Sequence, residues 1–65
     1  MKDTKITKDG KTYLISQRMT ENRWFWLFTI YEIDAETNKV KNLLGKRQAM
    51  RIEDALDDVL KEANR

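Results

Sequence analysis

The stretch that decides the fold is WFWLFTIYEI, residues 24–33. Eight of its ten residues are hydrophobic, and most of these are aromatic or β-branched. Such side chains favour extended structure, and a short apolar run between turn residues is typical of a buried strand. The flanking residues, Thr20–Arg23 and Asp34–Asn38, are polar and turn-like. The stretch therefore predicts a central strand over Trp24–Ile33.

Further strands are predicted on both sides of this central strand. Asp9-Gly10 is a strong signal for a type I′ turn, because both central residues of that turn must accept a positive φ. It joins a short strand over about Asp3–Lys8 to a second over about Lys11–Met19. After the central strand, a further strand is expected over Lys39–Gly45, or as far as Gln48. Consecutive strands with short connections predict an antiparallel meander.

The C-terminal residues show the spacing of an amphipathic helix. Apolar side chains recur at i, i+4, i+7, i+8 and i+11, at Ile52, Leu56, Val59, Leu60 and Ala63. Acidic residues at the start and basic residues at the end suit the helix dipole. The fold class predicted for residues 1–65 is a single α+β domain. It is an antiparallel three- to four-stranded β-meander with one C-terminal α-helix packed on one face (ββββα).

The turns also predict the strand register, and hence which side chains share a face. The pairs they imply are Met19 with Trp24, Lys8 with Lys11, and Asp34 with Lys39. All three registers place one apolar set on a common face, which is expected to receive the helix. This set is Ile6, Tyr13, Ile15, Met19, Trp24, Trp26, Phe28, Ile30 and Leu43.

The other face of the sheet is expected to be uncovered, because one short helix cannot cover both faces. It carries too many large apolar side chains for an ordinary monomer surface, and such patches mark interaction sites. The predicted interaction face is Phe25, Leu27, Tyr31, Ile33, Leu14, Val40 and Leu44. Three cations near its aromatic residues, Lys5, Arg18 and Lys46, are predicted nucleic-acid contacts.

Composition narrows the classes of function. The chain has 65 residues and a net charge of +2, with no cysteine, histidine or proline. It therefore lacks the thiolates and imidazoles that serve most nucleophilic, general-base and zinc chemistry. We expect no enzymatic activity, no catalytic residue, no cofactor and no metal. The acidic series Asp54, Asp58 and Glu62 lies at i, i+4 and i+8 and is expected to be a solvated helix face.

Two hypotheses for function follow from these patterns. The leading one is a protein-interaction module, either a homodimer through the uncovered face or a small regulator docking on a larger protein, as is typical of phage and mobile elements. The alternative is DNA or RNA binding by the sheet, since the helix is acidic and phosphate would repel it. Residues 1–51 hold 11 Lys/Arg against 6 Asp/Glu, whereas residues 52–65 hold 2 against 5. The lack of cysteine and of a long apolar stretch predicts a cytoplasmic location and no membrane partner.

Overall fold

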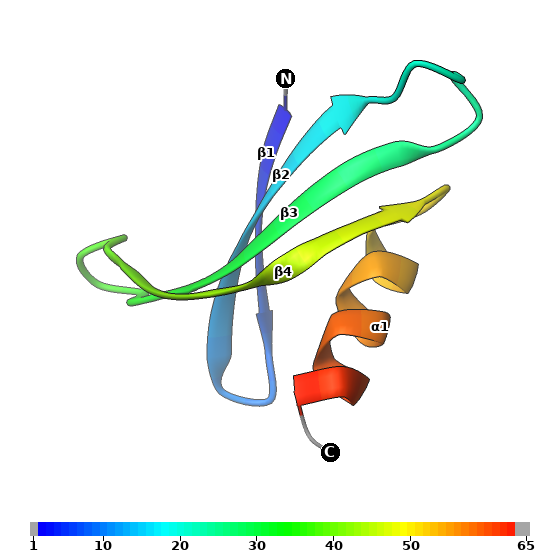
Figure 1. The fold of residues 1–65 in the computed structure, drawn as a ribbon. Helices are drawn as coiled ribbons and strands as arrows, with labels where there is room; N and C mark the ends of the chain where they lie inside the picture. The colour runs from blue at the N-terminus through cyan, green and yellow to red at the C-terminus, as the bar shows by residue number, and fades with distance from the viewer. Residues whose placement is uncertain (1, 64–65) are drawn as a thin grey trace.

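The computed structural model describes residues 2–63, which form four strands followed by one helix (Figure 1). The strands are β1 (Lys2–Lys8), β2 (Lys11–Met19), β3 (Trp26–Ile33) and β4 (Val40–Ala49). They form one antiparallel sheet in chain order. The helix α1 (Ile52–Ala63) lies on one side of this sheet, against β4 and β3. The α+β, ββββα architecture predicted from the sequence is confirmed, with four strands.

The β1–β2 hairpin has the predicted turn and register. Asp9 has a φ of 52° and Gly10 a φ of 78°, so both central residues take the left-handed conformation that a type I′ turn requires. Lys8 pairs with Lys11 as predicted. The same register places Ile6 opposite Tyr13, on the helix-facing side of the sheet.

The predicted β2–β3 register is wrong by two residues. Met19 pairs with Trp26 rather than Trp24, because the connection is the longer loop 20–25 and not a four-residue turn. A shift of two residues keeps every β2 and β3 side chain on its predicted face, since strand side chains alternate with period two. Trp24 itself lies in the loop and is 77% exposed, so its assignment to the core is wrong. Met19 is 60% exposed at the end of β2.

Two irregularities in the β3–β4 pairing change the face on which β4 side chains lie. The predicted turn closes as expected, with the Asp34 N–H donating to the Lys39 carbonyl at 2.9 Å. Further along, Ile33 pairs with Val40, Tyr31 with Leu43, and Ile30 with Gly45. Each shift in register leaves one extra β4 residue, first Lys41 and then Leu44, which is the signature of a β-bulge. The predicted pairing of Leu43 with Ile30 is therefore wrong. Leu43 is 59% exposed, and Leu44 packs against the core instead.

The hydrophobic core lies between α1 and the helix-facing side of the sheet. Its buried members are Tyr13, Ile15, Phe28, Ile30, Ala55, Leu56 and Val59. Full burial of one large apolar side chain stabilises a fold by about 1.5–3 kcal/mol, so this cluster supplies most of the driving force. Ile52 and Leu60 are partly buried beside it, as the predicted helical spacing requires, whereas Ala63, the last member of that spacing, is exposed. Within residues 2–63, no helix has the length and apolarity needed to traverse a lipid bilayer.

Candidate interaction surface

The side of the sheet opposite α1 is the open face, and within residues 2–63 no element packs over it (Figure 1). The strand registers arrange its side chains in four cross-strand rows. From the β3–β4 turn toward the other end, the rows are Thr7-Thr12-Ile33-Val40, Lys5-Leu14-Tyr31-Leu43, Asp3-Ser16-Thr29-Lys46 and Arg18-Leu27-Gln48. The first two rows hold most of the large apolar side chains, which we call the apolar half. The last two rows are mainly polar and basic.

The structure brings four of the predicted interaction residues together in the apolar half. Tyr31 and Leu14 are half-buried, Ile33 is buried, and Val40 is 56% exposed on the edge strand. Leu43 joins them, although the sequence placed it on the opposite face. The free surface of this half is therefore concentrated on β4, at Val40 and Leu43.

The other three predicted interaction residues lie elsewhere. Leu27 is on the open face, but the row containing Ser16 and Thr29 separates it from the apolar half. Phe25 lies in the loop before β3 and is 40% exposed. Leu44 packs against the core cluster, because the bulge turns it toward the helix side. Its assignment to the interaction face is corrected accordingly.

Hydrogen bonds hold the end of the open face beside the β3–β4 turn. The Asp34 carboxylate accepts the backbone N–H groups of Glu36 at 2.8 Å and Thr37 at 3.1 Å. These backbone hydrogen bonds lower the pKa of Asp34 from its usual value. Lys5 donates from Nζ to Asn38 Oδ1 at 2.6 Å, which links edge strand β1 to the turn.

The three predicted nucleic-acid contacts are exposed but are not brought together. Lys5 lies on β1, Arg18 on β2 and Lys46 on β4, each in a different row. Lys5 is engaged with Asn38 as described above. Among residues 2–63, Arg18 and Lys46 make no ion pair. The cations of the open face that form no ion pair are therefore in its last two rows.

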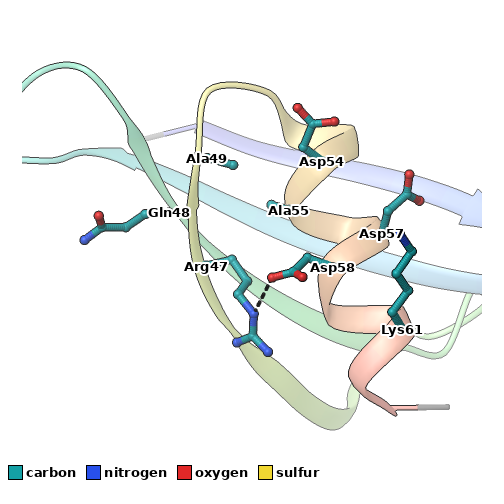
Figure 2. Close-up of a pocket in the computed structure, with 8 residues that line it drawn as sticks. All are labelled: Arg47, Gln48, Ala49, Asp54, Ala55, Asp57, Asp58 and Lys61. Atoms are coloured by element: carbon teal, nitrogen blue, oxygen red, sulfur yellow. Dashed lines mark hydrogen bonds and ion pairs between the residues drawn. The ribbon is translucent and has the colours of Figure 1, made fainter. Parts of the chain in front are cut away.

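The helix side carries a polar groove between β4 and α1 (Figure 2). Arg47 donates from Nε to Asp58 at 3.0 Å and also pairs with Glu62. Lys8, at the β1–β2 turn, donates to Asp57 at 2.7 Å. The hydrogen bond from Lys8 and its positive charge lower the pKa of Asp57, and the same bond raises the pKa of Lys8.

The groove offers little for ligand chemistry. Its acidic side chains, Asp54, Asp57 and Asp58, are exposed, and the last two pair with Lys8 and Arg47. In the part of the chain that the structure describes, no three acidic groups are placed to hold a metal ion. The acidic series at Asp54, Asp58 and Glu62 is a solvated helix face, two of whose members pair with Arg47.

The end of the sheet at the β2–β3 loop exposes a second apolar group that the sequence did not reveal. Met19, Trp24, Phe25 and Met50 are 60%, 77%, 40% and 67% exposed. The β2–β3 loop and the β4–α1 connection lie at the same end of the molecule, because Met19, Trp26 and Ala49 form the last cross-strand row (Figure 1). We call this region the loop tip; it comprises Arg18, Met19, residues 20–25, Met50 and Arg51.

Within residues 2–63, the exposed large apolar side chains lie on the open face and at the loop tip, whereas three acids of the helix side form ion pairs. Reasoning from sequence missed the loop tip because a four-residue turn would have placed Trp24 inside β3. The longer loop depends on Asn22, whose Oδ1 accepts the Trp24 N–H, a hydrogen bond that the number of residues between the strands does not indicate. Comparison of the chain with protein-family models, curated proteins and solved structures gave no match.

Proposed function

We propose that this chain is a non-catalytic module that docks through the apolar half of its open face onto an acidic surface of a larger protein. The observation that carries the proposal is the exposure of Val40 and Leu43, at 56% and 59%, beside half-buried Tyr31 and Leu14. An exposed apolar patch with a polar rim is typical of a protein-binding surface. Tyrosine in particular is enriched in such interfaces.

The charge of the open face favours a larger partner over a second copy of the chain. Its rows contain the cations Lys5, Arg18 and Lys46 and the single acid Asp3. A symmetric dimer through the whole open face pairs that face with itself, so the cations of both copies would lie within one interface. Like charges across an interface are unfavourable, whereas an acidic partner complements the same cations.

Partner capture with matched variants tests the proposal. Immobilised wild-type protein is expected to retain a specific acidic protein, and Leu43→Asp is expected to lose it. Ala63→Asp, a change of similar kind at an exposed position of α1, is the control and should retain it. Circular dichroism checks that both variants are folded. Capture that survives both Leu43→Asp and Val40→Asp would contradict docking through this face. If the wild-type chain forms a concentration-dependent dimer and Leu43→Asp dissociates it, the partner of this face is a second copy of the chain and not a larger protein.

The second candidate function is nucleic-acid binding by the sheet. It is favoured by the exposure of Arg18 and Lys46, which make no ion pair within the described residues. Binding carried by phosphate contacts weakens steeply as salt rises. Labelled duplex DNA or RNA should then bind at low ionic strength, and Lys46→Glu, which changes the sheet but not the loop tip, should weaken the binding. The absence of a gel shift under these conditions would rule this candidate out.

A further inference from the structure

The loop tip combines exposed apolar side chains with exposed arginines. Arg18, Arg23 and Arg51 belong to the same end of the sheet as Trp24 and Phe25, and all three are exposed. None of these three arginines forms an ion pair with another residue in the described range 2–63. None of the chain's eight lysines belongs to the tip. Arginine differs from lysine in binding phosphate oxygens bidentately and in stacking on aromatic faces.

The two aromatic residues of the tip are held by an ordered loop. Backbone N–H groups donate from Arg23 to the Thr20 carbonyl at 3.2 Å and from Trp24 to Asn22 Oδ1 at 3.0 Å. The Thr20 hydroxyl lies 2.7 Å from both Asn22 Oδ1 and the Phe25 carbonyl oxygen and can donate to either. Arg23 takes a positive φ of 60°, which turns the chain before Trp24. A surface that is ordered before binding loses less conformational entropy when a ligand arrives.

The order of residues in the loop argues against insertion into a membrane. Glu21, Asn22 and Arg23 lie in the middle of the loop, and the aromatic side chains follow them. Immersing the loop in hydrocarbon would bury Glu21 and Arg23 as well, which is costly for charged groups. A ligand that is itself anionic and presents flat faces matches the tip better. Nucleic acid has both properties.

We propose that the loop tip binds single-stranded nucleic acid, with bases stacked on Trp24 and Phe25 and backbone phosphates contacted by Arg18, Arg23 and Arg51. Aromatic side chains stack on any unpaired base, whereas the bases of a duplex are already stacked on one another. The site is separate from the apolar half of the open face. Tyr31 lies five residues along β3 from Trp26, a distance of about 17 Å. Nucleic-acid binding at the loop tip can therefore be tested independently of docking through Leu43.

Fluorescence anisotropy with a labelled single strand of mixed sequence, about 12 nucleotides long, is the test. Three phosphate contacts on a single strand should weaken binding about 20-fold between about 50 mM and 200 mM salt. Trp24→Ala should weaken binding about 10- to 100-fold, the effect of losing one stacked base. Trp24→Phe should restore much of it, since a flat aromatic face remains. Arg23→Gln should reduce the slope of log affinity against log salt by about 0.7, whereas the loop control Lys39→Gln should leave it unchanged.

Any of three results with the oligonucleotides would overturn the proposal. The first is no binding of the single strand at low salt, and the second is binding that Trp24→Ala leaves unchanged. The third is binding of the matching duplex as tightly as the single strand, which would exclude stacking on unpaired bases. Mixed phosphatidylcholine–phosphatidylserine vesicles serve as a competing probe. Trp24-dependent binding to the vesicles and not to the oligonucleotide would assign the tip to a membrane surface and contradict the proposal.

Discussion

Phe28 is the largest side chain that the core buries completely, with 1% exposure. Replacing a buried phenyl ring with a methyl group costs about 3–5 kcal/mol, because burial is lost and a cavity remains. A domain of this size has a total margin of about 3–5 kcal/mol, so Phe28→Ala should be largely unfolded. Urea unfolding followed by circular dichroism measures this. Trp24→Ala is the control, since its side chain is 77% exposed and its loss should change stability by no more than about 0.5 kcal/mol.

If Phe28→Ala retained a sharp unfolding transition near that of the wild type, the core would lie elsewhere or another chain would supply the missing stability. A large drop in the urea midpoint of Trp24→Ala would mean that the Trp24 side chain is packed against the fold, which contradicts its exposure.

Leu43 and Leu44 are adjacent in sequence but differ in what their side chains contact. Leu44 packs against the core cluster, whereas Leu43 is 59% exposed on the open face. Leu44→Ala should lower the free energy of unfolding by about 1–3 kcal/mol, less than for a fully buried leucine. Leu43→Ala should change it by no more than about 0.5 kcal/mol. Equal urea midpoints for the two variants, or the reverse order, would show that the bulge at Leu44 is misplaced.

At the scale of elements, α1 is tied to the sheet by charged contacts at both edges of its packed face. Lys8 reaches it from the β1–β2 turn and Arg47 from β4. Exposed ion pairs each contribute little to stability, and salt screens them. For function, these ion pairs partly neutralise the acids of α1. The exposed arginines of the loop tip, in contrast, form no ion pair among residues 2–63.

The Lys8–Asp57 pair predicts a direction for the pH dependence of stability. Its hydrogen bond and charge lower the pKa of Asp57 below the ordinary value of 3.8, so the folded state favours the carboxylate. This contribution is present above that ordinary pKa and is lost as pH falls through the lower pKa of the folded state. Asp34, whose pKa is lowered by backbone hydrogen bonds, acts in the same direction. The urea midpoint should therefore be steady near neutral pH and fall in acid below about pH 4.

Asp57→Asn removes the contribution of the Lys8–Asp57 ion pair to the pH dependence of stability. The variant should be slightly less stable at neutral pH and should lose less stability on acidification than the wild type. Urea midpoints of the two proteins, measured at a series of pH values, give the difference in their acid sensitivity. Identical profiles would mean that the Lys8–Asp57 pair makes no contribution in solution.

The elements themselves were predictable because their signals are local. Asp9-Gly10 specifies a two-residue turn, and the spacing of Ile52, Leu56 and Val59 specifies the helix face. The loop tip and the bulged part of β4, from Val40 to Gly45, were not predictable for a physical reason. A loop's length depends on its own hydrogen bonds, here those of Asn22, and a bulge depends on packing across strands. Counting residues between two strands reveals neither.

For the whole molecule, the separation of charge between sheet and helix has a structural cause. The acids of α1 lie on its solvent side, and several face Lys8 and Arg47. The open face and the loop tip carry one acid each, Asp3 and Glu21, and within residues 2–63 their exposed cations Arg18 and Lys46 form no ion pair. An acidic partner would therefore be drawn to the sheet side of the molecule and away from the helix.

Docking through the open face is tested most directly by cross-saturation NMR on the labelled chain, bound to the partner that it captures. The proposal predicts that saturation transfers to the amides of the apolar half, at Leu14, Tyr31, Val40 and Leu43. The amides along the solvent side of α1 should remain unaffected. Transfer confined to α1 and to the groove beside Arg47, with none on the open face, would contradict it.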